Sequence, residues 1–261
     1  MRPVIDIVAD MGEGFGKYSI ADDTKLLDLV SSANIACGFH AGDPQIMSQT
    51  VKQAIEKGVG IGAHPSFPDL VGFGRRKLDA STWEVTTDVL YQLGALSAFT
   101  KAHGGQIQHV TPHGALGNLV AIDSNYANAV LDAVELFDPN LIILSQPDEL
   151  FFAAKERGLK TAAIIFADRA YNDEGKIVSR SEPNAVLHDP EVIVQRCLDM
   201  VINQKVTTIT GKEIEVQGNS LLIHGDNKGS LELAEKIKTS LIDAGVEIQG
   251  IDKQLSTKTH T

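Results

Sequence analysis

Short β-rich runs alternate with amphipathic stretches along almost the whole chain, and this alternation limits the possible folds more than any other feature. The pairs follow one another without a Pro/Ser linker or a break in composition. The runs 141–144 and 161–166 are continuously apolar, as is typical of parallel strands covered on both faces. The pattern predicts one α/β domain over residues 1–250, a distorted (β/α) barrel of about seven parallel strands, with an open doubly wound sheet as the alternative.

Individual elements can be placed from periodicity and from capping residues. Asp43 followed by Pro44 predicts the start of a helix, and Gly58 its end. A hairpin turning at Gly211 and Lys212 is predicted over 206–216, and residues 251–261 are expected to form a flexible tail. The predicted strands are 4–8, 34–37, 59–63, 107–111, 141–144, 161–166, 221–224 and 246–248. The predicted helices are 22–30, 43–57, 81–103, 124–137, 147–157, 190–203 and 231–244.

Charge and composition exclude several classes of function. The chain has 23 Lys and Arg against 34 Asp and Glu, a net charge of −11, which disfavours nucleic acid as a partner. No apolar run approaches the ~18 residues that would span a bilayer, and the N-terminus has no signal layout, so we expect a cytoplasmic protein. Cys37 and Cys197 are isolated, which leaves histidine and carboxylate as the ligands for any metal.

Histidine and aspartate residues, mostly beside glycine or proline, recur where the predicted strands end. In a parallel barrel these strand ends meet at one mouth, where the βα loops form the active site. Such a group suits acid–base chemistry or a metal site that activates water, and it points to hydrolysis or to C–N bond chemistry. The candidate catalytic residues are Asp10, His40, His64, His113, Asp168 and His224. Asp10, His64 and His113 are also the candidate ligands of a divalent metal.

Each candidate also has a structural explanation. Asp43 fits a helix cap, and His40 could simply bond loop backbone. The glycine-rich loop 12–18 is a weak phosphate-loop pattern, because its spacing is one residue short and Tyr18 replaces the Ser or Thr that binds magnesium. The segment 72–76 is either an anion clamp or a solvated basic pair. His103, His109, His188 and His260 lack a comparable context and are expected to be ordinary.

Taken together, the segments at the predicted strand ends resemble those of the LamB/YcsF family. They occur in the same order as in that family and cover nearly the whole chain. The matching stretches are 6–16, 32–44, 60–69, 72–76, 112–116, 166–171 and 224–227. The resemblance implies a barrel of the glycoside hydrolase/deacetylase type. It also implies opening of the lactam of 5-oxo-L-proline to L-glutamate, coupled to hydrolysis of ATP, in a complex with two other subunits of the 5-oxoprolinase. A homo-oligomer is a further possibility.

For such a reaction the loops should bind substrate or phosphate as well as move protons. The candidates for this binding are Glu13, Arg75, Arg76, Arg169, Asp226 and Asn227. Three positions depart from the family pattern: Val8 stands where asparagine is usual, Thr111 where lysine is usual, and Gly117 where tyrosine is usual. Loss of the lysine predicts reduced or redirected activity. The alternatives are a stand-alone metal-dependent C–N hydrolase or deacetylase and a non-catalytic subunit.

Overall fold

Seven parallel strands close into a barrel in the computed structural model, which describes residues 2–180, 182–224 and 229–258. The strands follow chain order around the barrel, and the last pairs with the first. The barrel predicted from the sequence is therefore confirmed, and the open sheet is rejected. The seven strands are β1 (Val4–Met11), β2 (Ser32–Ala36), β3 (Gly60–His64), β4 (Ile107–Val110), β5 (Ile142–Ser145), β6 (Thr161–Phe166) and β9 (Ser220–Leu222).

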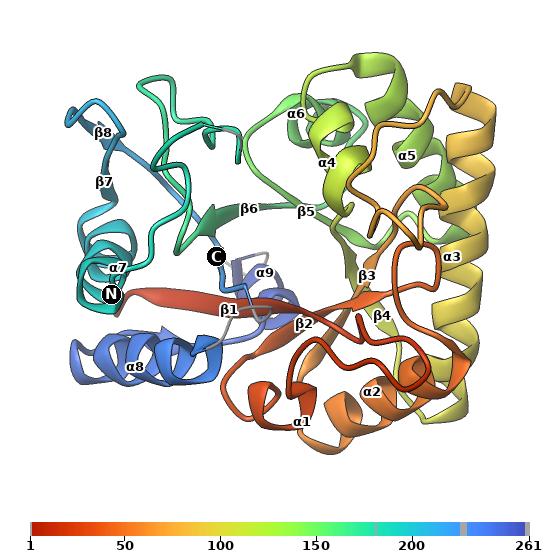
Figure 1. The fold of residues 1–261 in the computed structure, drawn as a ribbon, viewed down its shortest axis with the longest axis horizontal. Coiled ribbons are helices and arrows are strands. Elements are labelled where there is room, and N and C mark those ends of the chain that lie inside the picture. The colour runs from red at the N-terminus through yellow and green to blue at the C-terminus, as the bar shows by residue number, and fades with distance from the viewer. Residues whose placement is uncertain (1, 181, 225–228, 259–261) are drawn as a thin grey trace.

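Three short strands lie outside this closed ring. β10 (Glu247–Ile248) pairs with the first two residues of β1, just before β1 turns to pair with β9. β7 (Lys205–Thr207) and β8 (Glu213–Glu215) form the predicted antiparallel hairpin, which projects from the barrel above α7 (Figure 1).

Helices surround the strands, with α3 packed along α5 on one flank and α7 along α8 on the other (Figure 1). Asp43 caps α2 as predicted, because its side chain accepts hydrogen bonds from the amides of Gln45 and Ile46. The helices are α1 (Asp23–Leu26), α2 (Pro44–Glu56), α3 (Thr82–Ala102), α4 (Gly114–Val120), α5 (Ser124–Phe137), α6 (Glu149–Glu156), α7 (Pro190–Leu198), α8 (Ser230–Asp243) and α9 (Ile251–Lys258). In the part of the chain that the structure describes, no helix is long and apolar enough to cross a membrane.

The predicted flexible tail is wrong over residues 251–258, which form helix α9. Ile251 is fully buried, and Gln254 donates hydrogen bonds to the carbonyl oxygens of Gln249 and Asn219. The helix is held in place by apolar contacts, because Ile251 and Leu255 pack onto the side chains that fill the barrel interior. The helical pattern of 251–258 is short and its mean hydropathy low, so the sequence alone favoured a loose end.

The barrel interior divides into an apolar floor and a polar mouth. Val8, Leu144, Ile164 and Leu222 belong to the floor cluster. Alternate residues of β1 point into the same space, so Asp10, two residues beyond Val8, reaches the mouth. Between β3 and β4 the register shifts: Ile61 pairs with Ile107 and Gly62 with His109, which leaves Gln108 without a partner in the ladder. This bulge decides which side chains of β4 enter the barrel.

Candidate active site at the barrel mouth

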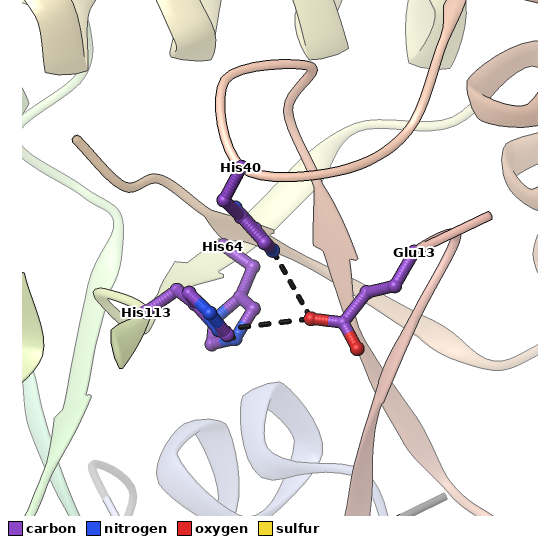
Figure 2. A group of neighbouring side chains, drawn as sticks. All are labelled: Glu13, His40, His64 and His113. Carbon is purple, nitrogen blue, oxygen red and sulfur yellow. Dashed lines mark hydrogen bonds and ion pairs between the residues drawn. The ribbon is translucent and has the colours of Figure 1, made fainter. Parts of the chain in front are cut away.

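Four predicted side chains from different loops and strands converge at the mouth. Glu13 follows β1, His40 follows β2, His64 ends β3 and His113 follows β4. One side-chain N or O atom of each lies within 4.8 Å of the corresponding atoms of the other three (Figure 2). We call these four residues the histidine–glutamate cluster. The sequence predicted that all of them lie at the mouth, because parallel strands bring their carboxyl ends to one side.

Contacts inside the cluster are short. His40 Nε2 lies 3.0 Å from Glu13 Oε1, and His113 Nδ1 lies 3.6 Å from the same oxygen. His113 Nδ1 also lies 2.9 Å from His64 Nε2. The rings of His40 and His113 stack in parallel, with centroids 3.8 Å apart and an interplanar angle of 7°.

Two backbone carbonyls fix the orientation of two of these rings. His64 Nδ1 donates to the carbonyl oxygen of Thr111 at 2.6 Å, and His113 Nε2 donates to the carbonyl oxygen of Phe73 at 2.9 Å. A carbonyl can only accept, so each of these nitrogens carries a proton. The second ring nitrogen of each histidine therefore faces the centre of the cluster.

Burial and neighbouring charge shift the pKa values of the histidines in opposite directions. Burial and the nearby charge of His64 lower the pKa of His113 to about 3, and the same two causes, with His113 added, lower the pKa of His40 well below its usual range. Burial opposes the charge on His64 as well, but Asp10, 3.5 Å away, outweighs it and raises the pKa of His64. Burial likewise would raise the pKa of Asp10, yet His64 holds it below its ordinary value. Asp10 and His64 thus favour each other's charged forms, while burial favours the neutral forms of His40 and His113.

A hydrogen-bonded chain inside the barrel orients Asp10. His109 Nε2 lies 2.8 Å from Asn34 Oδ1, and Asn34 Nδ2 donates to Asp10 Oδ1 at 2.9 Å. Because an amide oxygen only accepts, His109 is the donor, and burial lowers its pKa to about 3. Gly62 makes room for this ring: a Cβ there would lie 2.0 Å from His109 Nε2. His109 was expected to be ordinary and was missed, because a sequence does not reveal the bulge at Gln108.

Asp168 and His224 form a second group at the mouth. His224 Nδ1 donates to Asp168 Oδ1 at 2.7 Å, and Arg180 Nη2 donates to His224 Nε2 at 3.0 Å. Burial would raise the pKa of Asp168, but its contact with His224 lowers it. Arg180, an exposed residue of the loop between β6 and α7, was missed in the sequence because no strand end or glycine turn marks it. His224 also lowers the pKa of Asp10 electrostatically, which places Asp10 between the two groups.

The predicted ligand-binding arginines have different surroundings. Arg75 is exposed and lies over the ring of Phe73, with 5.0 Å between its Cζ and the ring centroid. Arg169 is buried and donates to the carbonyl oxygen of Val178 at 2.6 Å. Burial, and then the charge of Arg180, lower the pKa of Arg169.

Arg76 was expected to bind an anionic ligand, but in the structure it binds a carboxylate of its own loop. Its guanidinium pairs with the buried carboxylate of Asp69, at 2.9 Å from Nε to Oδ1, and this contact lowers the pKa of Asp69 to about 2. Asp69 also accepts from the amides of Gly72 and Arg76, so the pair folds the loop. Asp226 and Asn227 lie outside the described residues.

Two of the three departures from the family pattern have a clear structural place. Val8 is buried in the apolar floor. Thr111 is buried, its hydroxyl donates to the carbonyl oxygen of Leu144, and its own carbonyl oxygen holds His64. At Gly117 a Cβ would lie 2.6 Å from the carbonyl oxygen of Pro112, so a side chain there requires the backbone to shift.

Comparison with known proteins agrees with this architecture. The family model described as "LamB/YcsF family" matches residues 5–256. A protein of Campylobacter jejuni subsp. jejuni, named as the A subunit of 5-oxoprolinase, is 47% identical over 249 residues, which cover 95% of this chain and 98% of that protein. The protein of the same name from Staphylococcus carnosus is 48% identical over 245 residues, covering 94% and 97% of the two chains.

Solved structures extend the comparison to the fold. The crystal structure of a lactam utilization protein from Thermus thermophilus superposes with a TM-score of 0.91 at 42% identity, covering 95% of this chain and 99% of that one. A peptidoglycan deacetylase from Bacillus subtilis matches with a TM-score of 0.51 and 17% identity, over 99% and 95% of the two chains, and shows a shared fold only. With the family model spanning nearly its whole length, this chain belongs to the LamB/YcsF family.

Proposed function

We propose that this protein opens the lactam ring of 5-oxo-L-proline to give L-glutamate, as the A subunit of an ATP-dependent 5-oxoprolinase with two partner subunits. The observation that carries the proposal is 47% identity over nearly the full length of both chains to a protein of that name. The structural neighbour titled a lactam utilization protein supports a cyclic amide as the substrate. The barrel mouth supplies the acid–base groups that hydrolysis of an amide requires.

His224 is the proposed general base. Its Nδ1 proton is held by Asp168, which leaves a lone pair on Nε2. This arrangement orients the imidazole so that Nε2 can take a proton from water, as an aspartate does for histidine in hydrolytic triads. The proton can then return to the ring nitrogen of the lactam when the C–N bond breaks.

Arg180 is the proposed contact for the substrate carboxylate. Its guanidinium now donates to His224 Nε2, so it blocks the atom that would act as base. A carboxylate is a stronger acceptor for guanidinium than a neutral imidazole is. Binding of the substrate anion would therefore draw Arg180 away from His224 and free the base in the same step. Arg75, at the side of the mouth near His113, is a second cation for this anion.

Coupling to ATP is proposed for the complex as a whole. A five-membered lactam is a stable amide, and transfer of a phosphoryl group from ATP to its carbonyl oxygen, with release of ADP, would activate the ring carbon. Water can then add to that carbon, and the C–N bond breaks with a proton going to nitrogen. Hydrolysis of the acyl phosphate that results gives glutamate and inorganic phosphate. Thr111 stands where other family members usually have a lysine, so one cation that could contact a phosphate is missing. We therefore propose a lower rate than in members that have the lysine, or a different substrate.

The test is reconstitution with the two partner subunits, 5-oxo-L-proline and ATP, with glutamate and ADP measured together. Glutamate that requires both ATP and this chain supports the proposal. Glutamate no higher than in the mixture without this chain would overturn it.

A stand-alone metal-dependent C–N hydrolase is the second candidate, favoured by the histidine–glutamate cluster. Hydrolysis of a lactam or an N-acetyl group by the chain alone, without ATP and dependent on added metal, would select it. A non-catalytic role predicts instead that His224→Ala leaves the rate of the assembled complex unchanged.

A further inference from the structure

We infer that Glu13, His40, His64 and His113 bind one divalent transition-metal ion of the zinc type. This goes beyond the leading proposal, ATP-dependent opening of the lactam, which assigns no step to these four residues. It rests on the positions of their donor atoms and on the hydrogen bonds behind them.

The spacing of the donor atoms fits one ion at their centre. In a tetrahedral zinc site with bonds of about 2.0–2.2 Å, neighbouring ligand atoms lie about 3.3 Å apart. The three contacts within the cluster are 2.9, 3.0 and 3.6 Å, and all four donor atoms lie within 4.8 Å of one another. The donor atoms are therefore close enough for one ion, and because the rings of His40 and His113 are stacked in parallel, one of them must turn before both nitrogens can point at it.

The hydrogen bonds orient the donor atoms correctly. Metal-binding histidines nearly always donate their other ring N–H to a carbonyl or carboxylate. His64 and His113 do so, to the carbonyl oxygens of Thr111 and Phe73. This leaves His64 Nε2 and His113 Nδ1 facing each other, and two imidazole nitrogens at 2.9 Å need a proton or a cation between them.

Packing holds the ligands in place. His40 is fully buried and stacked on His113, and Phe73 packs edge-on against both rings. At Gly74 a Cβ would lie 2.7 Å from His40 Cβ and 2.9 Å from His113 Cδ2, so glycine is needed behind the stack.

The ligand types select the class of metal. Three imidazoles and one carboxylate suit zinc, cobalt, nickel or copper better than calcium or magnesium, which prefer oxygen ligands. The set differs from the one predicted from the sequence, because Asp10 is replaced by Glu13 and His40. Asp10 is held by Asn34 and lies 3.5 Å from His64 Nε2, beside the cluster rather than within it.

The test uses the full chain without substrate, prepared without chelator or nickel resin. We expect close to one zinc equivalent by elemental analysis. After removal of the metal, Co(II) should restore one equivalent and give the visible absorption bands of a tetrahedral site. His40→Ala and Glu13→Gln should weaken Co(II) binding by more than the roughly 10–100-fold that loss of an outer partner costs. The matched control is His188→Ala, which replaces an exposed histidine and should bind Co(II) as tightly as wild type does.

Metal-free protein that binds no Co(II), or equal binding by wild type, His40→Ala and Glu13→Gln, would overturn the inference. Circular dichroism of each variant shows whether it is folded. If the alanine variant fails to fold, His40→Gln provides the same comparison with a smaller change in volume. Because no lactam or ATP is present, failure here is independent of failure of the proposed activity.

Discussion

Histidines at the barrel mouth differ in chemistry because each meets a different partner. The carboxylate of Asp10 raises the pKa of His64, whereas burial, with His64 nearby, lowers the pKa of His113 to about 3. His224 is oriented by Asp168 and covered by Arg180. The residue type alone therefore does not define the role, and each role can be tested by a single substitution.

Replacing Arg180 tests the contact with the substrate carboxylate. Arg180→Ala should raise KM for 5-oxo-L-proline by roughly 10-fold or more, since it removes a charge-assisted contact, with a smaller effect on kcat. Arg180→Lys should recover part of the affinity, because a lysine keeps the charge but not the bidentate geometry. Steady-state kinetics of the reconstituted complex measure both constants. An unchanged KM would contradict the assignment.

His109 is a positioning residue, because it acts on Asp10 through Asn34. His109→Leu leaves the buried Asn34 oxygen without a donor, which should cost about 1–3 kcal/mol of unfolding free energy. Because Asp10 is one of the catalytic residues predicted from the sequence, we also expect a lower kcat with little change in KM. His109→Gln places an amide N–H near the position of Nε2 and should restore kcat. If leucine and glutamine variants have the same kcat, His109 fills space only.

Asp6 should make the stability of the protein depend on pH. Its carboxylate accepts hydrogen bonds from Ser31, Ser32 and Ser220, but burial, reinforced by the charge of Asp252, raises its pKa to about 6 from 3.8. The native state therefore holds this proton more tightly than the unfolded state. Its stabilising effect is full below pH 3.8 and is lost as the pH rises through 6.

Asp6→Asn removes this dependence. Relative to wild type, its unfolding free energy should rise by roughly 2.4 kcal/mol between pH 4 and pH 7.5, which is most of the about 3 kcal/mol that a shift of roughly 2 pKa units implies. Urea unfolding of both proteins across this range measures the difference, and other titrating groups cancel in it. Parallel curves for the two proteins would show that Asp6 does not titrate as stated.

At the scale of elements, helix α9 closes the floor of the barrel. Ile251 is fully buried against Val8, Ile142 and Leu222 in the floor cluster. Ile251→Ala should therefore lower the unfolding free energy by about 2–5 kcal/mol, as for other large-to-small changes in a core. Ile122→Ala, at a residue 77% exposed, is the matched control and should stay within about 0.5 kcal/mol of wild type. Equal effects of the two changes would show that α9 does not contribute to the core.

Most elements could be predicted because their signals are local. The apolar run of β6 and the periodicity of α5 gave their bounds directly, and Asp43 with Pro44 gave the start of α2. The helix predicted over 22–30 shortens to Asp23–Leu26, and α4 was not predicted, since its seven residues begin at Gly114 after Pro112. The C-terminal part of the helix predicted over 190–203 is a π-helical segment, Asp199–Asn203.

The site was predicted in part for the same reason. Strand ends located the histidines of the cluster, because topology brings them to one mouth. His109 depends on a bulge and Arg180 on the path of a long loop, and neither is encoded by a short pattern. The pairing of Arg76 with Asp69 is likewise a property of the folded loop.

At the scale of the whole molecule, a chain with a net charge of −11 presents arginines at its one polar mouth. Arg75 and Arg180 both act electrostatically on Arg169, although they come from loops after β3 and β6. Local positive charge of this kind attracts an anionic substrate to an otherwise acidic protein.

The most direct test of the account is glutamate formation by this chain with its two partner subunits, 5-oxo-L-proline and ATP. We predict glutamate and ADP in the presence of all components, and none above background when this chain is omitted. The complex with His224→Ala should assemble yet be roughly 10²–10⁴-fold slower, the usual loss on removing a general base. No glutamate from the complete mixture, or an unchanged rate with His224→Ala, would contradict the account.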